Sequence, residues 1–133
     1  MALILTLGIK KNLDVGDVGG PSFGDANEGQ CFILEFTASF LFIFIIHAAA
    51  ADSNQAKLFR PYWSGILIGT CCFINIMSTS KLVGGGACFN PARALGPAIA
   101  TGDFKKKWIY VIAPGMAAVA HSTVYRMAPY KKR

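Results

Sequence analysis

Formal charge is scarce in this chain, which distinguishes it from soluble proteins. Only 15% of the 133 residues are charged and 53% are hydrophobic, whereas soluble domains are usually about a quarter charged. The net charge is +6, but Lys and Arg gather at the edges of the apolar runs, where they act as membrane-interface anchors. No basic stripe alternates with aromatic residues, so nucleic acid is not an expected partner.

The sequence also lacks the residue sets of enzymes and metal sites. It contains no HExxH motif, no paired carboxylates and no combination of nucleophile, base and orienting group, so we predict that the chain is not an enzyme. Four cysteines are present without zinc-ligand spacing, and we interpret them as small buried hydrophobic residues. Neither a metal nor a cofactor is predicted.

Three long apolar runs organise the chain, at residues 31–51, 62–79 and 108–125. A helix of this length crosses about 30 Å of hydrocarbon. The runs lack the polar face of a helix packed on a soluble core, and aromatic residues lie at their ends, where an interface belt is expected. We therefore predict an all-α, multi-pass integral protein of a lipid bilayer, in a membrane that the sequence does not specify.

The segment at 81–104 is too interrupted by Gly and Pro to span a membrane, and too apolar for a solvent loop. Such a segment is typical of a re-entrant element, which requires shielding by protein or a water-filled cavity. Gly84, Gly85 and Gly86 allow the backbone to descend with its carbonyls toward a pore, and Cys88 follows them closely. We predict that this backbone lines the pore.

A short helix is predicted at 92–100, directly after Asn90 and Pro91. Asn is a favoured N-cap and Pro suits the first helical position. The N-terminus of this half-helix would carry a positive partial charge at mid-membrane. Arg93 is the strongest single indication of function, because a charge at that depth normally marks a water-filled path.

Two stretches carry a family resemblance, GGGACFNPARALGPAI and WIYVIAPGMAA. The first resembles the second NPA loop of the major intrinsic protein family, the aquaporins and aquaglyceroporins, and the second is similar to the start of that family's sixth helix. The resemblance covers roughly 30–129. It implies helices four to six with a re-entrant half-helix, which is one inverted repeat of a six-helix fold. Residues 1–29 would be a helix end and an exposed loop, and 130–133 a basic tail.

The resemblance implies roles for individual residues. Asn90, Pro91 and Ala92 match the signature triplet, and Glu35 matches a buried acid that holds the loop backbone. The implied selectivity filter consists of three residues, Arg93, Ser78 and Ala87. Ser78 stands where water-selective members often have His, which indicates a wider or differently polar constriction.

The resemblance implies a passive channel, and four further positions bear on its solute. Ala94, Ala98 and Tyr110 favour water, whereas Val111 favours glycerol channels. Water is the preferred solute, with small neutral solutes such as glycerol or urea left open.

Only one NPA triplet is present, so the resemblance implies a missing first repeat. We expect either part of a longer channel, homotetrameric at full length, or a half-unit that pairs with another channel subunit. Under the family topology, Lys and Arg are equally numerous at both ends, so charge does not fix the orientation. The alternative is a non-conducting protein that associates with full-length channels, suggested by Gly65 and Gly69 in a GxxxG pattern. His47 is expected to be structural, and His121 and Asn75 are expected to bond between helices.

Overall fold

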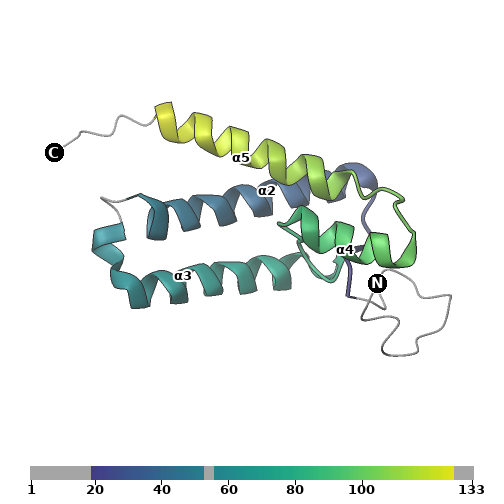
Figure 1. Ribbon diagram of the computed structural model, residues 1–133, viewed down its shortest axis with the longest axis horizontal. Helices are drawn as coiled ribbons and strands as arrows, with labels where there is room; N and C mark the ends of the chain where they lie inside the picture. Colours follow the sequence, from purple (N-terminus) through teal and green to yellow (C-terminus); the bar gives the residue numbers. More distant parts are fainter. Residues whose placement is uncertain (1–18, 53–55, 128–133) are drawn as a thin grey trace.

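The structure, a computed structural model, describes residues 19–52 and 56–127. The regular secondary structure of the described chain is helical apart from one pair of two-residue strands. Helices α2 and α5 lie side by side, α3 runs along α2, and the short α4 lies at one end of the bundle (Figure 1). The elements, in order, are β1 (Ser22–Phe23), α2 (Glu28–Ile46), η1 (His47–Ala51), α3 (Ala56–Thr79), β2 (Val83–Gly84), α4 (Pro91–Thr101) and α5 (Ile109–Met127). The predictions for 1–18 and for the basic tail fall outside the described residues.

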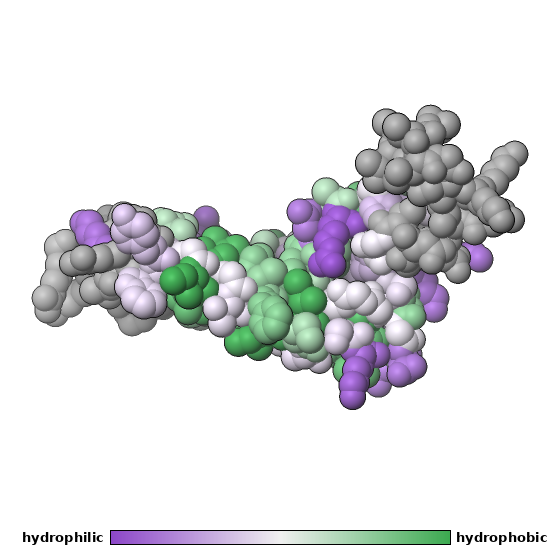
Figure 2. All heavy atoms as spheres, turned by 90° about the horizontal axis from the view of Figure 1, so that it is seen from below, coloured by the Kyte–Doolittle hydropathy of each residue, from purple (hydrophilic) through white to green (hydrophobic). Residues whose placement is uncertain are grey.

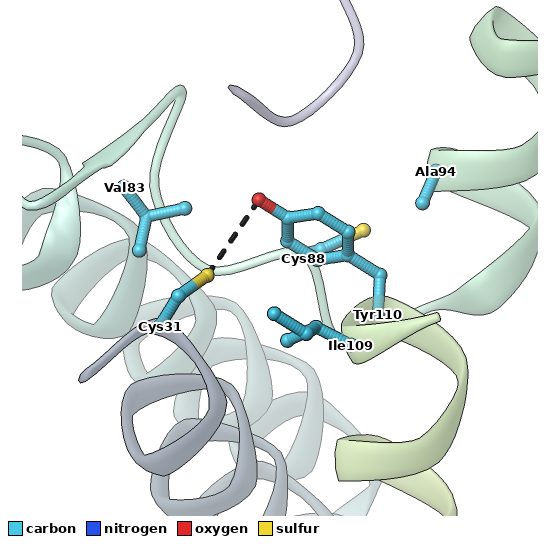
Figure 3. Packing of buried hydrophobic residues seen from close by; sticks show 6 residues of the cluster. All are labelled: Cys31, Val83, Cys88, Ala94, Ile109 and Tyr110. Carbon is cyan, nitrogen blue, oxygen red and sulfur yellow. Dashed lines mark hydrogen bonds between the residues drawn. The ribbon is translucent and has the colours of Figure 1, made fainter. Parts of the chain in front are cut away.

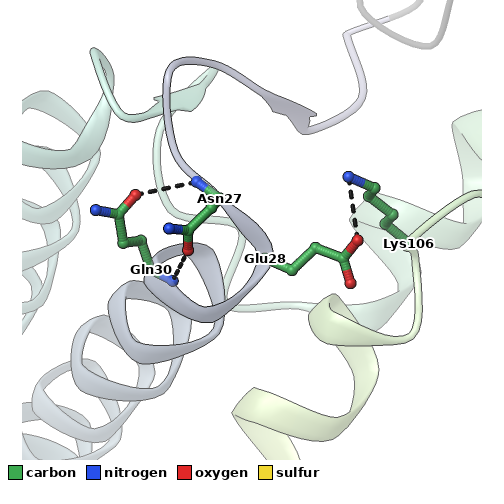
Figure 4. Close-up of polar contacts among 4 residues, drawn as sticks. All are labelled: Asn27, Glu28, Gln30 and Lys106. Carbon is green, nitrogen blue, oxygen red and sulfur yellow. Dashed lines mark hydrogen bonds and ion pairs between the residues drawn. The ribbon is translucent and has the colours of Figure 1, made fainter.

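Helix α2 begins at a capping box. The side chain of Asn27 accepts a hydrogen bond from the Gln30 N–H at 2.9 Å, and the Asn27 N–H donates to Gln30 Oε1 at 3.0 Å (Figure 4). These two bonds satisfy amides that have no partner inside the helix. Glu28 in the first turn forms an ion pair of 3.1 Å with Lys106. Both side chains are half exposed, so this pair contributes little to stability.

At its other end, α2 continues into η1, a π-helical turn that begins at His47. The Asp52 N–H donates to the His47 carbonyl at 2.8 Å and closes this turn. Ser64 on α3 donates its hydroxyl to the Ala49 carbonyl at 2.7 Å. Single π-turns interrupt the regular helical ladder and are often found at functional sites.

Helix α4 is half as long as a membrane span because both of its ends are defined by the sequence. Asn90 is its N-cap and Pro91 its first residue, while Gly102, with φ of 78°, ends it by donating to the Ala98 carbonyl at 2.8 Å. A positive φ is cheap for glycine. Its 11 residues extend about 16 Å, roughly half of the hydrocarbon thickness.

Two segments in the described residues are long and apolar enough to cross a membrane, Glu28–Ala51 and Tyr62–Thr79. Helix α5 has 19 residues but is not one of them, and it carries Pro114 in its interior and the polar His121, Ser122 and Thr123. The prediction of a third span at 108–125 therefore stays a prediction. An all-α membrane fold is consistent with this architecture.

Helix α3 is the least packed of the long helices. Only 6% of its apolar stretch Tyr62–Thr79 is buried, against 22% of the most apolar 18 residues within Glu28–Ala51. Figure 2 shows hydrophobic side chains along the middle of one face and hydrophilic ones gathered mainly toward one end. The exposed large side chains of α3 are Tyr62, Trp63, Ile66, Phe73, Ile74 and Met77. This surface is open within the described chain.

The densest core lies at the end of the bundle that holds α4. Its members come from α2, β2, the following loop, α4 and α5, and they are Cys31, Val83, Cys88, Ala94, Ile109 and Tyr110 (Figure 3). The Cys31 thiol donates to the Tyr110 hydroxyl at 3.7 Å. Cys31 and Cys88 are buried free thiols, as expected, whereas Cys71 and Cys72 are only half-buried.

The segment before α2 is packed on this core and is not wholly exposed, contrary to the expectation of a water-exposed loop. Strand β1 pairs antiparallel with β2, and Pro21 and Ala26 are buried. Lys107, expected as an interface anchor, is also buried and donates from Nζ to the Pro21 carbonyl at 2.8 Å. Burial lowers the pKa of Lys107 below its ordinary value.

Candidate functional site

The loop between α3 and α4 descends through a backbone conformation that requires glycine. Gly85 and Gly86 have φ of 85° and 74°, in the region that disfavours other residues. A Cβ atom added to Gly86 would lie 2.6 Å from the Ile76 carbonyl oxygen. Gly84 lies opposite Ser22 in the strand pair. The loop therefore passes against α3 more closely than any side chain would allow.

Glu35 on α2 holds the next part of the loop. Its side chain is completely buried, and its two carboxylate oxygens accept from the Cys88 N–H at 2.7 Å and the Phe89 N–H at 3.3 Å. Phe89 has φ of 58°, which is costly for a bulky residue. A buried carboxylate needs donors, and the two loop amides supply them while being fixed in this strained turn.

Thr79, at the end of α3, forms a second attachment that the sequence analysis missed. Its hydroxyl accepts from the Ala87 N–H at 2.7 Å and donates to the Asn75 carbonyl at 2.7 Å. The neighbouring Ser78 is exposed and donates to the same carbonyl at 3.1 Å. The sequence does show a hydroxyl in the last turn of α3. Its hydrogen-bond partner, eight residues further along the chain, comes within reach only through the fold of the loop.

Arg93 extends from the first turn of α4 back over the loop. Its Nη1 donates to the Ala87 carbonyl at 3.2 Å and its Nη2 to the Gly85 carbonyl at 3.5 Å. Asn90 caps the helix by accepting from the Ala92 N–H at 2.9 Å. The structure thus brings the guanidinium, the two loop carbonyls and the helix N-terminus together. Of the loop carbonyls predicted to face a pore, that of Gly85 accepts from Arg93.

The remaining predicted positions lie in the core or on the outer surface. Ala94, Ala98 and Tyr110 are completely buried. Cys88 is buried too, with its thiol donating to the Asn90 carbonyl at 3.2 Å. Val111 lines an apolar groove of about 530 Å³ between α2 and α5. The side chains of Ala94, Ala98 and Tyr110 therefore belong to the packing around the loop.

Asn75 corrects one prediction. It was expected to bond between helices, but its side-chain amide donates to the Cys71 carbonyl, 3.0 Å away in the same helix. The carbonyl one turn back is within reach of any Asn in a helix, so a partner on another helix is not needed. His121 does bond to another helix, as described below.

Two stretches of the described chain are long and apolar enough to cross a membrane, and the short helix α4 has about half that length. Residues 2–125 match the family model described as "Major intrinsic protein", so the chain belongs to the major intrinsic protein family. This family comprises channels and not enzymes, in agreement with the absence of a catalytic set.

Curated relatives support this membership. The chain is 36% identical to "Aquaporin NIP3-1" of Zea mays over 81% of its own length and 34% of the relative's. It is 36% identical to "Nodulin-26" of Glycine max over 76% of its length and 35% of the relative's. It is 31% identical to "Aquaporin NIP3-1" of Arabidopsis thaliana over 89% of its length. The chain spans about a third of the length of these relatives.

Proposed function

We propose that this chain supplies the second half-loop of a passive transmembrane channel for water. The observation that carries the proposal is the placement of Arg93, whose guanidinium donates to the carbonyls of Ala87 and Gly85 beside the N-terminus of α4. A fixed cation is costly in lipid, and is accommodated where water reaches it.

This arrangement suits a neutral solute and opposes a cation. The N-terminus of α4 carries a positive partial charge, and Arg93 adds a full positive charge one turn into the same helix. Together they repel cations and protons, while their remaining N–H groups can donate hydrogen bonds to a passing oxygen. Glu35 and Thr79 act as supports that fix the loop backbone beneath Arg93.

The solute class follows from the polarity of the constriction. Ser78 is exposed beside Thr79, which holds the loop. It presents a small hydroxyl at the position where water-selective members of the family often have the larger ring of His. A smaller side chain leaves room for solutes larger than water, so glycerol and urea are the second class we propose. The name aquaporin, which two of the three relatives above carry, favours water.

A complete pore needs a second half-loop, and the open face of α3 is the surface that would meet it. Trp63, Phe73 and Met77 expose more than half of their surface there. We propose one inverted repeat that pairs with a first repeat or with another channel subunit, in a homotetramer at full length. The first repeat, inverted relative to this one, would place an opposing half-helix at the midplane.

The proposal is tested by joining the chain to the first repeat of a relative and reconstituting the assembly in liposomes. Osmotic water permeability should rise well above that of empty liposomes, and Arg93→Val should let cations or protons through. Lys105→Ala, an exposed charge outside the loop, should behave as the unaltered assembly. Equal permeability and selectivity in the assemblies with and without Arg93 would contradict the proposal.

The second candidate is a non-conducting partner of full-length channels. Gly65 and Gly69 lie on the exposed face of α3, and a Cβ atom at either would meet nothing within 4 Å. Such a flat surface permits close approach of another membrane helix. Co-purification with a full-length relative, lost in Gly69→Leu and without permeability of its own, would favour this candidate over the channel.

A further inference from the structure

A cluster of polar rings joins the helices at the end of the bundle opposite the loop. His47, at the start of η1, and His121, on α5, place Nδ1 and Nε2 2.9 Å apart. The His47 ring also stacks on Tyr125, with ring centres 4.1 Å apart. The Tyr125 hydroxyl donates to Asp52, just after η1. None of these groups belongs to the site described above.

The surroundings of His121 are apolar. Its side chain is 4% exposed, and the edges and faces of Phe40 and Phe44 lie within about 6 Å of the ring centre. Its second nitrogen, Nδ1, is buried and has no hydrogen-bond partner among the described residues. Water therefore has little access to this ring.

The geometry limits the number of protons that the two rings can carry while the hydrogen bond between them persists. A hydrogen bond between two imidazoles uses one N–H and one lone pair. Buried N–H groups without partners are rarer than unused acceptors, so we assign the donor to Nε2 of His121 and leave its Nδ1 as a bare lone pair. A first added proton would create a cation among phenyl rings. A second would turn both facing nitrogens into donors and break the bond.

The titratable groups that contact the pair within the described residues are Tyr125 and, through it, Asp52. Asp52 already accepts from Tyr125 and is bound to the end of η1. Arg126, on α5, and Lys57, near the start of α3, lie at the same end but are exposed and would repel added positive charge.

We propose that the His47–His121 pair is an acid-sensitive latch that joins η1 to α5 near neutral pH and opens when the rings are protonated. A histidine in the unfolded chain takes up its proton near pH 6.5, whereas in the folded chain a second proton on the pair breaks the hydrogen bond between the rings, and the His121 ring lies among phenyl rings. Acidification therefore favours separation of α5 from the end of α2 and η1. This inference is independent of the proposed channel, because it concerns the opposite end of the bundle.

Nuclear magnetic resonance of the ¹⁵N-histidine-labelled chain in lipid bilayers tests the latch directly, since the sequence contains only two histidines. At pH 8 we expect a nitrogen-to-nitrogen coupling between the rings, and at pH 5 its loss with the appearance of imidazolium signals. Absence of the coupling at pH 8, or its persistence at pH 5, would overturn the proposal.

Stability measurements with a matched pair of variants provide the second arm. His121→Phe keeps an aromatic ring but removes the titrating nitrogens, and Ser122→Ala alters an exposed neighbour. Between pH 8 and pH 5 the midpoint of thermal unfolding should fall by about 4 °C more in the unaltered chain and in Ser122→Ala than in His121→Phe. An equal fall in all three would overturn the latch. If His121→Phe does not fold, the resonance experiment alone decides.

Discussion

The two ends of the bundle are held together in different ways. At the loop end, side chains bond to backbone: Glu35 and Thr79 accept from loop amides, and Lys107 donates to the Pro21 carbonyl. At the far end, Ser64 also donates to a backbone carbonyl, but η1 and α5 are joined by a contact between two side chains, the His47–His121 pair. The first arrangement fixes the course of the main chain. The second fixes the distance between helices and depends on protonation.

The largest loss of stability at the loop end is expected from a substitution of Glu35. Glu35→Gln replaces one carboxylate oxygen with an NH₂ group, so one of the amides of Cys88 and Phe89 then faces a donor inside the core. We expect a loss of about 3 kcal/mol in the free energy of unfolding, measured by denaturation in detergent.

The matched control for this substitution is Glu28→Gln, which makes the same chemical change at a half-exposed side chain. It should cost less than about 1 kcal/mol. Similar losses in both variants would show that the loop does not depend on the buried carboxylate.

The next largest loss of stability is expected where the loop packs directly against α3. Gly86→Ala brings a Cβ atom to 2.6 Å from the Ile76 carbonyl and forces a positive φ on alanine. We expect a loss of about 2 kcal/mol. Gly69→Ala, on the open face of α3, meets nothing within 4 Å and should leave the stability unchanged or raise it by up to about 1 kcal/mol. A tolerated Gly86→Ala would mean that the loop can take another path.

The smallest effect is a pH dependence of stability at the loop end, which is expected in alkaline solution, whereas that of the latch is expected in acid. Burial lowers the pKa of Lys107 below 10.5, so the folded chain releases this proton at a lower pH than the unfolded chain. Between those two values the unfolded state binds more protons, and the free energy of unfolding rises with pH. The stability of the unaltered chain minus that of Lys107→Met should therefore increase toward pH 10.5.

Lys105→Met is the control for this measurement, because Lys105 is exposed beside Lys107 in the sequence. Its stability difference from the unaltered chain should stay flat over the same range. A flat difference for Lys107→Met would contradict the buried position of the ammonium group.

Local features of the fold could be predicted from the sequence, because they depend on neighbours along the chain. Asn90 and Pro91 define the start of α4 through capping chemistry, and the glycines before them indicate an unusual backbone. The family resemblance rested on these same residues. The apolar runs at 31–51 and 62–79 likewise predicted helices of spanning length.

Pairings between distant elements could not be predicted in the same way. The Thr79–Ala87, Lys107–Pro21 and His47–His121 contacts each depend on how elements meet in space. No periodicity or spacing encodes such contacts. The π-turn at η1 was also missed, because a run of alanines carries no signal for an extra residue in one turn.

The anchoring of Arg93 has a consequence for how the channel would behave in acid and alkali. Its guanidinium donates to two peptide oxygens, and such oxygens have no proton to gain or lose in the physiological range. Arginine itself stays charged throughout that range. The barrier to ions at the loop should therefore keep the same height from acidic to alkaline solution, even while the histidine latch at the opposite end opens and closes.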